Sequence, residues 1–139
     1  MNSLAFQDDD VIKAALSSKR IAVVGLSANP SRPSHSVSRA MQANGYTIIP
    51  VNPHAPEILG EPCYARLADI PGAVDIVNVF REPGAIASIV DDAISIKAPF
   101  VWLQLGVVDE GAAQTAHAAG IGVIMDRCIA VELRRWKNG

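Results

Sequence analysis

The sequence has little cysteine, almost no net charge and no long apolar run, and each shortage excludes a class of protein. Its two cysteines, Cys63 and Cys128, do not form the disulfide framework of a small secreted domain, so we expect a reducing, cytoplasmic setting. A formal net charge of −2 provides no overall attraction to nucleic acid or to an anionic membrane. Proline, glycine or charge interrupts each apolar run before it could span a bilayer. Residues 1–10 hold three successive aspartates, so we expect no secretory leader.

The residues that carry metal or acid–base chemistry are also sparse. The three histidines are never three or four positions apart, and no Cys-x-x-Cys occurs, so no metal site is indicated. The candidate loops contain no Ser/His/Asp set and no pair of catalytic carboxylates. We therefore predict no catalytic residue and no metal.

What the sequence does contain is a regular alternation of apolar runs and helical patterns. Half of the residues are hydrophobic, which suffices for one buried core, so we expect a single domain over residues 1–139. Five apolar runs rich in β-branched residues predict parallel strands buried on both faces: Arg20–Val24, Tyr46–Val51, Val74–Val79, Phe100–Leu105 and Ile121–Met125. Helical patterns lie around them at Asp8–Ser17, at Val37–Met41 with a stop near Gly45, and at Tyr64–Ile70, Ile86–Ile94, Asp109–Ala119 and Ile129–Trp136.

This alternation predicts an α/β fold of the Rossmann-like, doubly wound type. We expect a five-stranded parallel sheet in the order 3-2-1-4-5 with helices on both faces. Ligands in such folds bind outside the carboxyl ends of the strands, where the winding reverses. The expected site is therefore made by four loops: Gly25–Ser36, Asn52–Pro56, Phe80–Pro83 and Gln104–Val107.

The loop after the first strand has the composition of an anion site. Gly25 permits a sharp turn and the close approach of backbone to a phosphate. Pro33 is typical of the first residue of a helix, and three serines surround that helix start. Arg32 would add a charge-assisted bond to a phosphate. An ordinary polar loop before a capped helix is the alternative.

The same loop lacks the fingerprint of a dinucleotide site. The G-x-G-x-x-G pattern needs glycine at the positions of Ser27 and Pro30. The second strand ends in Pro50-Val51-Asn52-Pro53, without the acidic residue that binds the ribose hydroxyls of NAD. An NAD(P)-dependent oxidoreductase is therefore the runner-up.

Five motifs in order resemble the small, stand-alone CoA-binding proteins, and through them the CoA-binding domain of the succinyl-CoA synthetase α subunit. They are VVGLS at 23–27, GYTIIPVNP at 45–53, ILGEP at 58–62, WLQLGV at 102–107 and MDRC at 125–128. The resemblance covers nearly the whole chain after residue 10. It implies that the chain binds coenzyme A or an acyl-CoA. Because no catalytic set is visible, we expect no enzymatic activity of its own.

The resemblance places the cofactor on the loops after the first, second and fourth strands, and topology adds the loop after the third. Where the synthetase pattern has a lysine, this sequence has His54-Ala55, so a cationic contact there would come from His54 or Arg32. Arg81 could instead cap a strand in solvent, and Gln104 could be a buried amide that ties loops together. The predicted cofactor-binding residues are Gly25, Ser27, Ala28, Asn29, Ser31, Arg32, Ser34, Asn52, Pro53, His54, Phe80, Arg81, Gln104, Leu105 and Gly106.

Two further readings of the function stay open beside simple binding of a small-molecule CoA ligand. One is a subunit that supplies only the CoA site to a protein partner, which the sequence does not identify. The other is a thiol-based regulator in which CoA forms a mixed disulfide with a cysteine. Against this hypothesis, Arg127 would favour a thiolate at Cys128 while Asp126 would oppose it, so we expect an ordinary, unreactive thiol.

Overall fold

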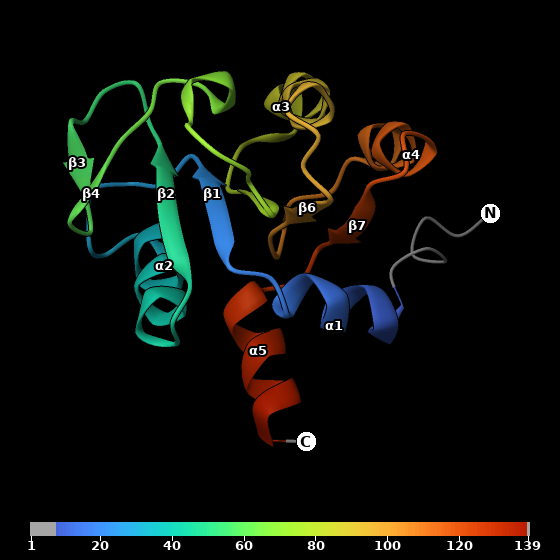
Figure 1. The fold of residues 1–139 in the computed structure, drawn as a ribbon, viewed down its shortest axis with the longest axis horizontal. Coiled ribbons are helices and arrows are strands. Elements are labelled where there is room, and N and C mark those ends of the chain that lie inside the picture. The colour runs from blue at the N-terminus through green and yellow to red at the C-terminus, as the bar shows by residue number, and fades with distance from the viewer. Residues whose placement is uncertain (1–7, 139) are drawn as a thin grey trace.

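Five parallel strands form the middle layer of the molecule (Figure 1). The computed structural model describes residues 8–138, so the expectation about residues 1–10 falls largely outside the described part. The strands are β1 (Arg20–Val24), β2 (Thr47–Val51), β5 (Ile76–Val79), β6 (Phe100–Leu103) and β7 (Gly122–Met125). All four pairings between them are parallel. The predicted five-stranded parallel sheet is thus confirmed.

The order of the strands corrects the sequence-based expectation. The sheet runs β2-β1-β5-β6-β7, which is 2-1-3-4-5 by position in the chain, and not 3-2-1-4-5. The reason lies in Pro50, whose carbonyl accepts the Tyr64 N–H at 3.0 Å on the side of β2 away from β1. In a parallel strand the N–H and C=O of one residue point the same way, so the missing N–H of proline faces this outer edge. A proline is tolerated there, because no neighbouring strand needs its hydrogen bond.

Helices cover both faces of the sheet. In Figure 1, α1 (Asp9–Leu16), α2 (Pro33–Ala43) and α5 (Ile129–Asn138) lie below it, and α3 (Pro83–Ser95) and α4 (Glu110–Ala118) lie above it. One apolar layer packs around the fully buried Trp102, and the second packs α3 and α4 against the opposite face of the same strands. The strands are buried on both sides, which explains their continuous apolar sequences.

Local sequence signals set the helix ends. The Oδ1 atoms of Asp8 and Asp109 accept the N–H groups of Val11 at 3.0 Å and Ala112 at 2.9 Å, which caps α1 and α4. Pro33 is the first residue of α2, as predicted. Gly45 follows the end of α2 with a φ of 94°, a left-handed conformation that favours glycine.

Two segments differ from the predicted elements. The expected helix at Tyr64–Ile70 is only a 3-10 turn, η2 (Leu67–Asp69). Tyr64 is extended, because its backbone pairs with the outer edge of β2. A hairpin of β3 (Glu57–Ile58) and β4 (Glu61–Pro62) was not predicted; its two turn residues both have positive φ, which is typical of the tight turns that join antiparallel strands.

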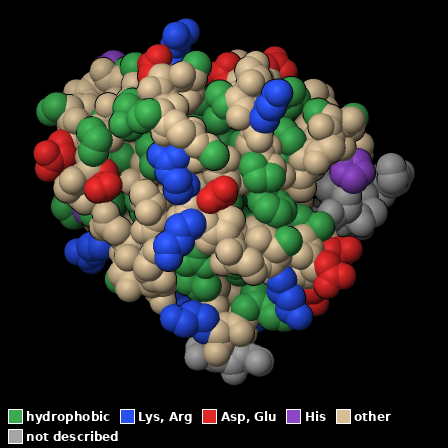
Figure 2. Space-filling view, in the orientation of Figure 1, with side chains coloured by type: hydrophobic (Ala, Val, Ile, Leu, Met, Phe, Trp, Pro, Cys, Tyr) green, Lys and Arg blue, Asp and Glu red, His purple; other side chains and the backbone are tan. Residues whose placement is uncertain are grey.

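The exposed face mixes both signs of charge. Figure 2 shows Lys and Arg side chains interspersed with Asp and Glu and with apolar patches, in keeping with the small net charge. Within residues 8–138, no helix is both long and apolar enough to cross a membrane.

Candidate functional site

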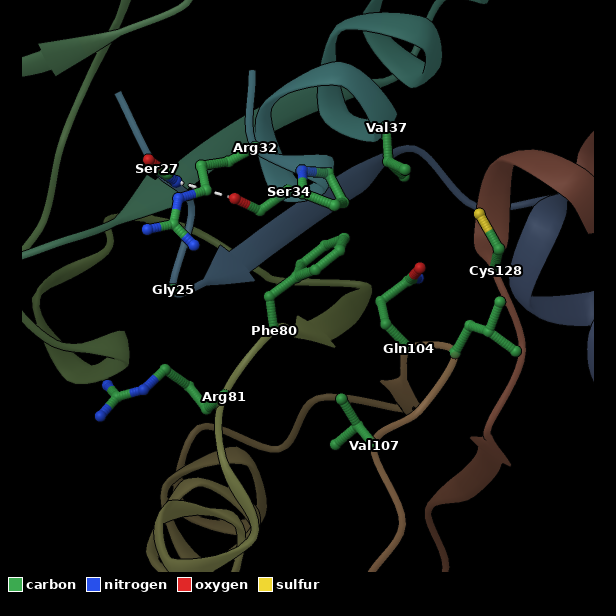
Figure 3. A pocket seen from close by; sticks show the side chains of 12 residues that line it. Gly25, Ser27, Arg32, Ser34, Val37, Phe80, Arg81, Gln104, Val107 and Cys128 are labelled. Carbon is green, nitrogen blue, oxygen red and sulfur yellow. Dashed lines mark hydrogen bonds between the residues drawn. The ribbon is translucent and has the colours of Figure 1, made fainter. Parts of the chain in front are cut away.

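A cavity of about 630 Å³ opens at the carboxyl edge of the sheet. It lies where the winding reverses, between the loops that follow β1 and β5, and it extends over the loop after β6 to the start of α5. Its lining residues are Gly25, Ser27, Arg32, Pro33, Ser34, Val37, Phe80, Arg81, Gln104, Leu105, Val107 and Cys128. Figure 3 shows Ser27, Arg32 and Ser34 on one side and Cys128 on the other, with Phe80 and Gln104 between them.

The corrected strand order decides which loops meet at the cavity. Because β5 and not β6 lies beside β1 on the side opposite β2, the backbone of Phe80 passes directly against Gly25. A Cβ atom on Gly25 would lie 2.3 Å from the Phe80 carbonyl oxygen, and Gly25 has a φ of 87°. Glycine at this position therefore permits two loops of the protein to touch, in addition to any approach to a ligand.

Hydrogen bonds between residues close in the sequence fix the conformation of the loop between β1 and α2. The Ser27 N–H donates to the Ser34 hydroxyl at 3.0 Å, the contact marked in Figure 3, and the Ser27 hydroxyl accepts the Asn29 N–H at 3.1 Å. The Asn29 side-chain oxygen accepts both the N–H and the hydroxyl of Ser31. Asn29 and Ser31 thus shape the loop, and neither lines the cavity; nor does Ala28.

The helix α2 starts at the cavity without a side-chain cap. Its N-cap residue is Arg32, which makes no capping hydrogen bond, and its first turn holds no acidic residue. The helix α3 likewise begins uncapped, after Glu82. Pro33 and Pro83 carry no N–H, and His35, Ser36 and Ala85 donate theirs to the carbonyls of the N-cap residues, so it is chiefly the positive dipole of these helix ends that suits an anion.

The two lining arginines differ in their partners. Arg81 forms a two-pronged ion pair with Glu82, at 3.0 and 3.2 Å, and this hydrogen bonding raises the pKa of Arg81 and lowers the pKa of Glu82. In Figure 3 its guanidinium extends away from the other lining side chains. For Arg32, an exposed residue, no ion pair occurs within the described part of the chain. Arg32 is therefore the cation that can turn to a ligand.

A tight turn after β6 forms another wall. The Val107 N–H donates to the Gln104 carbonyl at 2.8 Å, and Gly106 takes a φ of 86°, so β6 ends at Leu103 and not at Leu105. Gln104 is 3 % exposed, and its Nε2 donates to Asn78 Oδ1 at 2.8 Å, so it does tie two strands together while it also lines the cavity.

The same turn carries an exposed apolar side chain at the cavity mouth. Leu105 is 71 % exposed and belongs to the lining residues. Gly106 does not line the cavity; its N–H donates to Asp126 Oδ1 at 2.7 Å, which fastens the turn to the loop after β7. Asp126 itself has a φ of 61°.

The loop after β2 braces the site from outside. Asn52 Nδ2 donates to the Leu26 carbonyl at 3.0 Å, and its Oδ1 accepts the His54 N–H at 2.7 Å. Asn52, Pro53 and His54 do not line the cavity, so contact of these three residues with the cofactor stays a prediction.

Four lining residues were missing from the predicted set: Pro33 and Val107, which lie within the predicted loops, and Val37 and Cys128, which lie outside them. Val37 had the pattern of a core residue in the apolar stripe of α2, and its position at the rim depends on where α5 packs. Cys128 follows β7 at the carboxyl edge expected for the ligand, although it was left out of the predicted set; it is a half-buried free cysteine in the cavity wall. Its position at the carboxyl end of the last strand is the sequence signal that points to this edge.

Ion pairs hold the segment that carries Cys128. The Trp102 indole donates to the Arg127 carbonyl at 2.8 Å. The carboxylate of Glu132, 8 % exposed, lies 3.7 Å from Arg127 and accepts a 2.9 Å hydrogen bond from Arg135. Within residues 8–138, no three His, Cys, Asp or Glu side chains gather as metal ligands.

Comparisons with known proteins agree with this architecture. Residues 19–134 match the family described as CoA binding domain. An uncharacterized protein of Bacillus subtilis, YneT, is 50 % identical over 114 residues, which cover 82 % of this chain and 84 % of that protein. A solved structure from Thermus thermophilus has 39 % identity and a TM-score of 0.87, and covers 92 % of this chain and 98 % of the other.

A second relative is a much larger enzyme. The ADP-forming acetate–CoA ligase II of Archaeoglobus fulgidus is 38 % identical over 63 residues, 44 % of this chain but only 9 % of the ligase. The family match spans all five long strands and the loops that form the cavity. The chain therefore belongs to the CoA-binding domain family.

Proposed function

We propose that the cavity binds coenzyme A, with the phosphate groups beside Arg32 and the start of α2. The observation that carries the proposal is the charge of the lining: its only ionic side chains are two arginines, with no Asp, Glu or His among the lining residues. An anionic ligand gains from both the cation and the uncapped helix, while no lining carboxylate repels it. Membership of the family supports the identity of this anion.

The runner-up, NAD, has less support from the geometry. Asn52 stands where a dinucleotide site has its acidic residue, and its side chain already bonds the Leu26 carbonyl and the His54 N–H. No carboxylate of the cavity lining could bind the ribose hydroxyls of NAD.

We infer a binding role and not catalysis for the same cavity. Arg81 is occupied by Glu82, and the lining lacks the base that would activate a hydroxyl or a thiol nucleophile. The residues present can orient a CoA molecule, exclude water from part of it and balance its charge.

Calorimetric titration with CoA, dephospho-CoA and NAD tests the ligand. We expect CoA to bind more tightly than NAD, and tighter binding of NAD would overturn the proposal. Dephospho-CoA separates the two phosphate regions. If it binds as well as CoA, the protein does not recognise the 3′-phosphate.

The variant Arg32→Ala tests the phosphate contact. One charge-assisted hydrogen bond contributes about 1.5–3 kcal/mol to the binding free energy, so its loss should lower the affinity for CoA about ten- to hundredfold. Arg39→Ala is the matched control, since Arg39 is an exposed arginine of the same helix that does not line the cavity. Added salt should weaken wild-type binding more than binding by Arg32→Ala. Equal affinities of the two variants would remove Arg32 from the site.

A further inference from the structure

A second hollow adjoins the cavity, between α2 and α5. It has a volume of about 240 Å³ and shares two residues, Val37 and Cys128, with the cavity. We call it the α2–α5 groove. The side chains along it are mostly apolar and come from the facing sides of the two helices; its remaining residues are Ser36, Ala40, Met41, Asn44, Ala130, Val131, Leu133 and Arg134.

The groove is open because small side chains face each other across it. Ala40 of α2 and Ala130 of α5 leave room between the helices, and Met41 and Leu133 lie buried below them. Val131 is 46 % exposed, so apolar surface at the groove meets water. Covering such surface releases free energy in proportion to the area removed from water.

The polarity of the site therefore changes from the start of α2, across the cavity, to the α2–α5 groove. Arg32, Ser34 and the start of α2 form a polar, cationic end. Gln104, a buried amide, lies in the middle, and Cys128 stands at the opposite side, where the groove begins (Figure 3). A ligand that matches this order is anionic at one end, carries amides in the middle and is apolar at the other end.

We infer that the preferred ligand is an acyl-CoA whose acyl chain lies in the α2–α5 groove. The inference rests on the proposed function, because the cavity must first hold the CoA part. Its thioester end would pass Val37 and Cys128, and a straight alkyl chain would then lie against Ala40, Ala130 and Val131. Free CoA leaves this groove in water and gains nothing from it.

Calorimetric titration of the full chain with CoA, acetyl-CoA, butyryl-CoA and hexanoyl-CoA tests the inference. Each methylene placed in the groove should tighten binding about fourfold, or about fifteenfold from acetyl-CoA to butyryl-CoA, which has two more methylenes. Binding of CoA without any gain along the series would overturn the inference and leave the proposed function standing. Failure of every CoA compound to bind would overturn both.

Substitutions in the groove locate the chain. Ala40→Phe should fill the groove and abolish the gain with chain length, while the affinity for CoA itself stays within about twofold of wild type. Ala87→Phe, on an exposed position of α3 across the sheet, is the matched control and should keep the full gain. Val131→Asp is the second variant, because its charge disfavours an alkyl chain without adding bulk; thermal unfolding checks both folds. A gain that persists in Ala40→Phe and in Val131→Asp would place the acyl chain elsewhere and overturn the inference.

Discussion

Replacing Gly25 with alanine tests the contact between the two loops that build the cavity. The added Cβ would lie 2.3 Å from the Phe80 carbonyl oxygen, far inside van der Waals contact, and this atom belongs to backbone at the end of β5. The loop cannot rotate away as a flexible side chain would, so one strand end must shift. Gly25 also has a φ of 87°, which disfavours any side chain.

The two costs can be estimated separately. A left-handed backbone costs an alanine about 1–2 kcal/mol, and forcing extra volume into a packed site costs about 1–3 kcal/mol more. Gly25→Ala should therefore lower the free energy of unfolding by about 2–5 kcal/mol. The matched control is Gly60→Ala, in the β3–β4 turn, where φ is 78° and no atom lies within 4 Å of the added Cβ. It should show only the first cost, about 1–2 kcal/mol.

Urea unfolding followed by circular dichroism measures both variants. The midpoint for Gly25→Ala should fall well below that for Gly60→Ala, at an unchanged slope with denaturant. Titration with CoA should also show weaker binding for Gly25→Ala alone, because the displaced loops line the cavity. Equal destabilisation by the two substitutions would refute the close contact of Gly25 with Phe80.

Three smaller predictions concern residues around the cavity. Asn52→Ala removes one hydrogen bond that braces the loop after β1 and one within the loop after β2, and chemical unfolding should show a loss of about 1–2 kcal/mol in the free energy of unfolding. Glu132→Gln removes a buried negative charge that pairs with Arg127 and Arg135, and thermal unfolding should show a loss of about 1–2 kcal/mol in the free energy of unfolding, less so at high salt. Burial, and then the charge of Glu57, raises the pKa of the Cys63 thiol. The rate at which Cys63 is alkylated should therefore rise at a higher pH than for a free cysteine, and Glu57→Gln should shift this rise to lower pH. A rise at the pH of a free cysteine would contradict the burial of Cys63.

The sequence holds a signal for the true strand order, the proline within the second strand, but the apolar pattern alone does not reveal it. The apolar run at 46–51 predicts a strand wherever the strand lies in the sheet. Pro50 within that run favours an edge position, because an inner strand would need the N–H that proline lacks. The consequence reaches the site: an edge β2 places Asn52 outside the cavity wall and brings Phe80 beside Gly25.

The sequence alone determined the strands, most helices and the edge of the sheet that carries the site. Apolar periodicity, Asp8 and Asp109 at helix starts and Gly45 at a helix end act within a few residues, so local patterns suffice to predict them. Only the tertiary structure decided that Val37 and Cys128 share a wall and that a groove continues beyond them. These features depend on how α2 and α5 pack against one face of the sheet. Residues more than ninety positions apart come together there only when the whole core forms.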